Sequence, residues 1–216
     1  MSETPAGSRL LDLVAVMDRL RSPSGCPWDA QQTHVSLLKY LVEESYEVVD
    51  AVENGTREEL RDELGDLLLQ VVFHARVAQE SADEPFDIDD VAAAIVSKLE
   101  RRHPHVFAGE AVAEDLQAGW DAIKATEKAR ESVLDGIPLS LPALARADKV
   151  LGRLQRNGLD DAVPDEGGDE ESFGRELLDL VRRAHASGVD PEAALRTATR
   201  RLETTARAAE REATSR

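Results

Sequence analysis

The apolar positions of this chain recur at the spacing of α-helices along most of its length. The first run, Leu10–Leu20, places apolar residues three or four positions apart and predicts a short helix. Ser22–Pro27 is rich in Pro and Gly and predicts a loop. Thr33–Glu53 predicts a long helix that ends at Asn54–Gly55, a pair typical of helix C-caps.

A second long helix is predicted directly after this turn. Thr56, with Glu59 three residues later, has the pattern of a capping box, and the helix is expected to run to about Ala82. Between Leu64 and Val72 the pattern is apolar nearly all round, which predicts a central, buried helix. Because the connection is short, the two long helices are expected to pack antiparallel.

The rest of the chain also predicts helices, and no segment has the alternation of a strand. The expected helices are Asp87–Arg102, Glu114–Glu131, Pro142–Arg156, Ser172–Ser187 and Pro191–Glu212. Residues 105–113 indicate a loop, and Gly136–Pro138 indicates a boundary between domains at 1–135 and 136–216. Residues 160–171 are acidic and Gly-rich and predict a mobile linker. The chain is therefore predicted to be all-α.

Composition narrows the possible partners. Hydrophobic residues make up 42% of the chain and aromatic residues 4%, so the core is expected to be aliphatic. A formal net charge of −17 argues against nonspecific binding to nucleic acid or to anionic membranes. The single cysteine, Cys26, excludes an intrachain disulfide and fits a reducing compartment. With no signal-peptide pattern and no apolar run of about 18 residues, a cytoplasmic protein is expected.

Acidic residues concentrate in the two long predicted helices. Glu43–Asp66 contains ten acidic residues and two basic ones. Glu43 and Glu47 are four positions apart and share a helix face, and Glu44 lies one position round. Glu63 and Asp66 share a face of the next helix. Since both groups lie at similar distances from the turn, their carboxylates are expected to converge and to bind Mg²⁺, with Mn²⁺ as a possible substitute.

A solvated acidic surface is the simpler alternative. It fits the acidic residues that flank the turn, namely Glu53, Glu58, Glu59 and Asp62. It fits Glu63 and Asp66 poorly, because they begin the most apolar helix and no basic residue follows until after Phe73. A di-iron bundle would need two Glu-x-x-His motifs, and only Glu100–His103 matches.

Basic and aromatic residues further along are candidates for contact with a phosphate or a base. Lys98 and Arg102 close the predicted helix 87–102, where cations either complement the helix dipole or bind phosphate. Trp120 and Lys124 are four positions apart and could hold a base and a phosphate, although Trp120 could equally be a core residue. His34, His74 and His185 show no spacing of a metal-binding pair.

These motifs resemble those of MazG-type nucleoside triphosphate pyrophosphohydrolases. The acidic signature is Glu43-Glu44-x-x-Glu47 followed by Glu63-x-x-Asp66. Supporting stretches are Gly25–Thr33, Glu63–Ala75, Lys98–Phe107 and Ile137–Val150, so the resemblance covers about residues 9–157.

The resemblance implies an all-α fold in which helical hairpins from two protomers form a core like a four-helix bundle. It implies hydrolysis of ribo- or deoxynucleoside triphosphates to the monophosphate and pyrophosphate, which cleans the nucleotide pool. Metal-binding carboxylates would be Glu43, Glu44, Glu47, Glu63 and Asp66. Substrate contacts would be Lys98, Arg102, Trp120 and Lys124. One of the glutamates on the first long helix (Glu43, Glu44 or Glu47) is expected to remove a proton from the attacking water.

Members of this family often carry two tandem domains, and here the second copy departs from the pattern. Aligning Gly174 with Gly65 places Ser172 opposite Glu63 and Arg175 opposite Asp66. Arg175 would repel a cation, so the 136–216 half is expected to be a shortened, structural copy, and any activity to come from residues 1–130. Two other interpretations stay open: a related enzyme acting on dUTP or phosphoribosyl-ATP, and a non-catalytic dimerisation or nucleotide-sensing protein.

Overall fold

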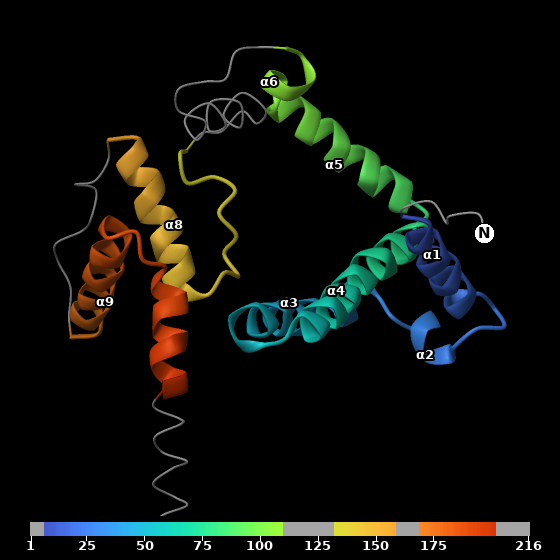
Figure 1. The fold of residues 1–216 in the computed structure, drawn as a ribbon, viewed down its shortest axis with the longest axis horizontal. Coiled ribbons are helices and arrows are strands. Elements are labelled where there is room, and N and C mark those ends of the chain that lie inside the picture. The colour runs from blue at the N-terminus through green and yellow to red at the C-terminus, as the bar shows by residue number, and fades with distance from the viewer. Residues whose placement is uncertain (1–6, 110–131, 159–168, 202–216) are drawn as a thin grey trace, which may run out of the picture. The chain divides into compact units, whose positions relative to one another are not determined.

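Helices form nearly all of the regular structure of the protein. The computed structural model describes residues 7–109, 132–158 and 169–201. Its helices are α1 (Ser8–Arg21), α2 (Pro27–Ala30), α3 (His34–Asn54), α4 (Arg57–Ala78), α5 (Ile88–Arg102), α6 (Pro104–Phe107), α8 (Ala143–Arg156) and α9 (Asp169–Ala186). Residues 191–201 are also helical, and the described residues contain no strand. The predicted all-α class is therefore confirmed (Figure 1).

The chain divides into two compact units, Met1–Leu116 and Gln117–Arg216. The division falls among residues outside the described ranges, so the domain boundary expected at 135/136 stays a prediction. The expected helix Glu114–Glu131 also lies outside them. Among the described residues, none of the helices combines the length and the apolarity needed to cross a membrane.

The first unit is built on the hairpin of α3 and α4, which lie side by side (Figure 1). The hydroxyl of Thr33 accepts a hydrogen bond from the Ser36 amide and begins α3, and Thr56 does the same with Glu59 at the start of α4. The second of these capping boxes is the one that the sequence predicts. α3 ends at the expected place, although Gly55 has extended backbone and not a left-handed conformation.

A small aliphatic and aromatic core joins α1 to this hairpin. Met17 of α1, Leu37 of α3 and Val72 of α4 are each 1% exposed, and Phe73 is 3% exposed. Burying these side chains is what fixes α1 against α3 and α4, since each buried aliphatic side chain contributes roughly 1.5–3 kcal/mol.

The expectation that Leu64–Val72 is buried on all sides is wrong. Leu64, Leu68 and Val71 are 48%, 40% and 39% exposed, whereas Val72 is buried. α3 and α1 cover only part of the circumference of α4, and within the described part of the chain the other side stays open to solvent. An all-round apolar helix needs neighbours on every side, and the described residues do not supply them.

Two short helices replace expected loops. α2 begins at Pro27 and α6 at Pro104, so each proline occupies the first helical turn, where its missing N–H and fixed φ are tolerated. α6 extends to Phe107, inside residues 105–113, which were predicted to form a loop. At the other boundaries α4 ends at Ala78 and not near Ala82, and α9 begins at Asp169, inside the segment expected to be a linker.

The second unit contains α8 and α9, which pack against each other. His185 of α9 connects them, because its Nδ1 lies 2.8 Å from Asp148 Oδ1 and its Nε2 lies 3.0 Å from Gln155 Oε1. Gly152 of α8 provides the space for this ring, since a Cβ at that position would meet His185 Cε1 at 2.9 Å.

Candidate active site

Three carboxylates from the two long helices meet on one side of the hairpin. Glu44 projects from α3, and Glu63 and Asp66 project from α4. One side-chain oxygen of each lies within 4.8 Å of the other two. We call these three residues the carboxylate cluster. The convergence follows from the spacing in the sequence: Glu63 and Asp66 are one turn apart on α4, and the short turn at Gly55 brings Glu44 to the same height.

The other two glutamates predicted for the site occupy different positions around α3. Glu47 contacts the cluster, because its side chain forms a hydrogen bond with Glu44 and its charge acts on Glu63. Glu43 acts on Glu44 only through its charge and is exposed. Neighbouring residues on a helix point about 100° apart, so Glu43 and Glu44 cannot both face α4. The metal-binding roles of all five residues stay predictions.

Burial and neighbouring carboxylates raise the pKa of two residues of the cluster, Glu44 and Glu63. Burial raises the pKa of Glu44 to about 7, and the Glu47 hydrogen bond and the charges of Asp66, Glu47 and Glu43 act in the same direction. The pKa of Glu63 is also raised, by burial first and then by the charges of four other carboxylates. Every one of these influences disfavours the ionised form, and no cation among the described residues offsets them.

A divalent cation fits this arrangement chemically. The donors are carboxylate oxygens, which Mg²⁺ and Mn²⁺ prefer over nitrogen or sulfur ligands. Oxygen ligands of an octahedral Mg²⁺, bound at 2.0–2.1 Å, lie roughly 3–4 Å from one another. The three carboxylate oxygens lie within 4.8 Å of one another, which is close to this range. Small side-chain rotations would bring them to ligand spacing.

The predicted substrate contacts are only partly placed by the structure. Lys98 and Arg102 lie in the last two turns of α5, where Lys98 is exposed and Arg102 is half-buried. Neither is among the groups that shift the pKa of Glu44 or Glu63. Trp120 and Lys124 lie outside the described residues. These four roles therefore stay predictions.

One acidic cluster of this kind is found in the part of the chain that the structure describes. In the second unit, Arg175 is half-buried on α9 at the position that aligns with Asp66. The second copy, the loss of its acidic pair and its structural role stay predictions.

The hairpin also brings together two histidines that looked isolated in the sequence. His34 is the first residue of α3 and His74 lies near the end of α4, and their Nδ1 atoms are 2.8 Å apart. The ring planes differ by 7° and the ring centres are 5.1 Å apart, so the rings lie edge to edge and share one N–H···N hydrogen bond. Spacing along the chain could not reveal this pair, because 40 residues separate its members.

The histidine pair predicts a dependence of stability on pH. His74 Nε2 is buried without a hydrogen-bond partner, and burial, followed by the charge of His34, lowers the pKa of His74 below its usual 6.5. As the pH falls, the unfolded chain takes up this proton at a higher pH than the folded chain does. The contribution of neutral His74 to the free energy of unfolding is therefore complete above pH 6.5 and is lost as the pH falls towards the pKa of the folded state. Urea unfolding of wild type and His74→Gln between pH 7.5 and 5 should show a steeper acid loss in the wild type. Parallel curves would contradict this account.

Comparisons with known proteins agree with this architecture. Residues 32–107 match the MazG nucleotide pyrophosphohydrolase domain. An uncharacterised 26.1 kDa protein of Streptomyces cacaoi is 56% identical over 209 residues, which cover 94% of this chain and 84% of that protein. A nucleoside triphosphate pyrophosphohydrolase of Escherichia coli is 42% identical over an alignment covering 92% of this chain and 86% of the relative.

A nucleoside triphosphate pyrophosphohydrolase of Mycobacterium tuberculosis is 52% identical over 166 residues. That alignment covers 76% of this chain and 50% of the relative, so the chain matches half the length of the mycobacterial protein. The domain match spans the hairpin that carries the carboxylate cluster, and the identities extend well beyond it. The chain belongs to the MazG nucleotide pyrophosphohydrolase family, a family of hydrolases.

Proposed function

We propose that this protein hydrolyses ribo- or deoxynucleoside triphosphates to the monophosphate and pyrophosphate, with Mg²⁺ as the metal and Mn²⁺ as a possible substitute. In the cell this reaction would remove unwanted nucleotides from the pool. The observation that carries the proposal is the carboxylate cluster, whose oxygens converge with no cation among the described residues to offset the raised pKa of Glu44. A divalent metal ion would offset the charge of these carboxylates and would link them to the negatively charged triphosphate.

Each residue of the site has a specific task in this proposal. Glu44, Glu63 and Asp66 would hold the ion, with Glu47 as a further ligand. When bound, the divalent ion offsets negative charge on the phosphate oxygens. Glu43, Glu44 or Glu47 takes the proton of the attacking water. Lys98 and Arg102 would contact the phosphates.

A panel of nucleotides tests the proposed reaction. The protein would be assayed for pyrophosphate release from the common ribo- and deoxynucleoside triphosphates, dUTP and phosphoribosyl-ATP, each with Mg²⁺ and with a chelator. The proposal expects pyrophosphate and a nucleoside monophosphate, and no release with the chelator. Turnover of dUTP or phosphoribosyl-ATP alone would indicate one of the related enzymes. Binding of nucleotide and Mg²⁺ without turnover would indicate a sensor and would contradict the proposed activity.

Metal binding at the cluster should compete with protons. Because Glu44 retains its proton up to about pH 7, a metal ion must displace it, and the affinity is expected to fall about tenfold for each pH unit below 7. Calorimetric titration with Mn²⁺ in two buffers of different ionisation enthalpy would measure both the affinity and the protons released. Glu44→Gln is the control, because glutamine has no carboxyl proton for the metal ion to displace. An affinity that stays constant from pH 6 to 8 would show that Glu44 is not a ligand.

We also propose that the protein acts as a homodimer in which a second copy covers the open side of the hairpin. Apolar side chains are exposed along both long helices: Val35, Leu38, Val42, Tyr46 and Val52 of α3, and Leu64, Leu68 and Val71 of α4. Apolar residues in such number on one hairpin usually mark an interface. A second hairpin presents the same apolar surface and would form a four-helix arrangement with the first.

A charge placed within this apolar surface should dissociate the dimer. Leu68 is 40% exposed at the middle of α4, and Leu68→Glu would bury an unpaired carboxylate in the interface. Light scattering after size-exclusion chromatography should give twice the 23.6 kDa chain mass for wild type and the single-chain mass for the variant. The matched change Leu11→Glu, on the exposed face of α1 at 68% exposure, should leave the mass unchanged. A monomeric wild type would contradict the proposal.

A further inference from the structure

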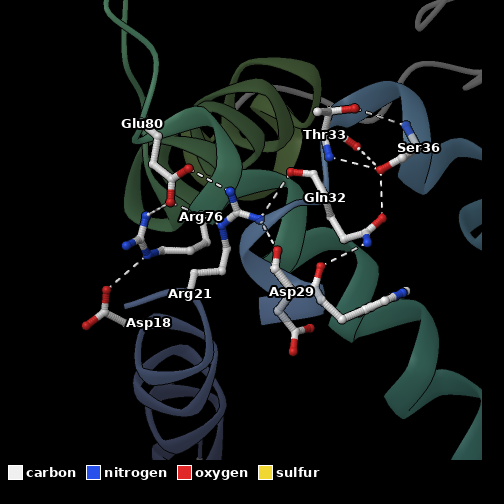
Figure 2. A network of polar contacts seen from close by, with 9 residues as sticks. Asp18, Arg21, Asp29, Gln32, Thr33, Ser36, Arg76 and Glu80 are labelled. Atoms are coloured by element: carbon white, nitrogen blue, oxygen red, sulfur yellow. Dashed lines mark hydrogen bonds and ion pairs between the residues drawn. The ribbon is translucent and has the colours of Figure 1, made fainter. Parts of the chain in front are cut away.

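A buried arginine joins three segments at the end of the hairpin opposite the turn. Arg21 is the last residue of α1, and its side chain is only 3% exposed. Its guanidinium donates hydrogen bonds to the carbonyl oxygens of Asp29 and Gln32, the latter at 3.2 Å. It also lies over the ring of Phe73, 5.6 Å from the ring centre. Figure 2 shows the hydrogen bonds from Arg21 to the carbonyl oxygens of Asp29 and Gln32.

The same guanidinium holds the end of α4. Arg21 Nε and Nη2 donate to Glu80 Oε1 and Oε2 at 3.1 and 2.6 Å, a bidentate pair just beyond Ala78 (Figure 2). Arg76 donates to the same Glu80 carboxylate at 2.9 Å and to Asp18 at 2.9 Å. A planar guanidinium fits a carboxylate in this way and lysine does not.

The carbonyl contacts of Arg21 reach the beginning of α3. Gln32, whose carbonyl Arg21 holds, accepts a hydrogen bond through its side-chain oxygen from Ser36 Oγ at 2.7 Å (Figure 2). Ser36 Oγ in turn accepts from the Thr33 amide at 2.9 Å, and this capping box sets the first turn of α3. Arg21 is therefore tied both to the start of α3 and to the end of α4.

We infer that Arg21 is a positioning residue for the carboxylate cluster. The turn at Gly55 fixes one end of the hairpin, and Arg21 fixes the other, where α3 begins and α4 ends. Glu44 stands on one of these helices and Asp66 on the other, so their oxygens meet only if the helices keep their relative position along the hairpin. A loosened open end would let the helices splay and would separate the ligands.

This role is indirect. Gln32 precedes Glu44 by 12 residues, roughly 18 Å along a helix, so Arg21 does not reach the cluster itself. Its effect must pass through the position of α3 against α4, because these two helices pack side by side and carry the cluster. The inference rests on the proposed metal site, and its test therefore includes a measurement that does not need the metal.

The test compares folded variants for Mn²⁺ affinity and for exchange of one amide. Arg21→Gln removes the guanidinium, Arg21→Lys keeps the charge without the fork, and Glu80→Gln weakens the α4 contact. Arg9→Gln is the matched control, because Arg9 lies on the same helix and pairs with Asp12 at 2.8 Å on the exposed surface. Mn²⁺ binding is measured by calorimetry at pH 8. Hydrogen exchange is followed at the Leu37 amide, which donates to Thr33 O in the first turn of α3.

We expect Arg21→Gln to weaken Mn²⁺ binding about tenfold while the circular dichroism stays that of a folded protein. The Mn²⁺ affinities of Arg21→Lys and Glu80→Gln should lie between those of Arg21→Gln and wild type. The variant with the weaker Mn²⁺ affinity should also show the faster exchange of the Leu37 amide. Arg9→Gln should match wild type in both measurements. If Arg21→Gln does not fold, the two milder variants decide the question by the same criteria.

Two results would overturn the inference. The first is a folded Arg21 or Glu80 variant whose Mn²⁺ affinity stays within twofold of wild type. The second is an unchanged exchange rate at Leu37 in those variants. If wild type binds no Mn²⁺, the proposed metal site is refuted, and the exchange rate of the Leu37 amide alone tests whether Arg21 anchors α3. Faster exchange in the variants supports this anchoring role, and unchanged exchange refutes it.

Discussion

Asp66→Asn is expected to lower kcat/KM for pyrophosphate release by about 10²–10³-fold, because removing a metal-binding carboxylate loses several kcal/mol of transition-state stabilisation. Asp66 is one of the three residues whose oxygens converge, and it faces Glu44 across the hairpin. Glu47→Gln is expected to act in the same direction, since Glu47 contacts Glu44 directly. The measurement is steady-state hydrolysis of a nucleoside triphosphate at saturating Mg²⁺.

A matched control separates the site from the acidic surface around it. Asp62 lies one turn before Asp66 on α4 and forms an ion pair with Arg61 at 2.9 Å, where both side chains are exposed. Asp62→Asn should therefore keep wild-type activity. Without metal, Asp66→Asn should unfold at the same temperature as wild type or higher, because it removes a charge that disfavours ionised Glu44. Wild-type activity in folded Asp66→Asn would refute the site.

Phe73→Ala is expected to destabilise the first unit by about 3–5 kcal/mol, which is the usual effect of emptying a buried aromatic site. Phe73 is 3% exposed and packs in the small core with Met17, Leu37 and Val72. Its loss also removes the ring beneath Arg21. Since the free energy of unfolding of a domain is typically about 5–15 kcal/mol, a loss of this size would leave the unit much less stable. Urea unfolding followed by circular dichroism measures the change.

The control for this change is an exposed phenylalanine in the same unit. Phe107 is 61% exposed at the end of α6, so Phe107→Ala should change the stability by less than about 0.5 kcal/mol. The two substitutions are expected to act on different properties. Asp66→Asn lowers activity and keeps the fold, whereas Phe73→Ala lowers the stability of the fold. A Phe73→Ala protein with nearly wild-type stability would show that the core lies elsewhere.

The hairpin could be predicted from the sequence because its signals are local. The capping box of Thr56 and Glu59 and the turn at Asn54–Gly55 depend on neighbours within a few residues. The positions of Glu63 and Asp66 on one helix face follow from the helical period alone. The MazG resemblance rested on the same stretch, and the family match at residues 32–107 bears it out.

Other features could not be predicted, because they depend on which surfaces meet. Spacing pairs Glu43 with Glu47 on one helix face, yet Glu44 and not Glu43 belongs to the carboxylate cluster. The apolar stretch around Leu68 predicted burial, but Leu68 is 40% exposed because α1 and α3 cover only part of α4 among the described residues. The contact of His34 with His74 arises only when α3 and α4 pack side by side.

Helix period and capping act over a few residues, so the residue pattern predicted the long helices, the turn between α3 and α4, and the acidic residues that could serve one site. The folded structure was needed to show which carboxylates converge and which apolar face is open among the described residues. It was also needed to show that Arg21 is buried and joins the start of α3 to the end of α4. The reason is that burial and ion pairing depend on how helices rotate and pack against one another. Small rotations of a helix decide which of two neighbouring side chains faces its partner.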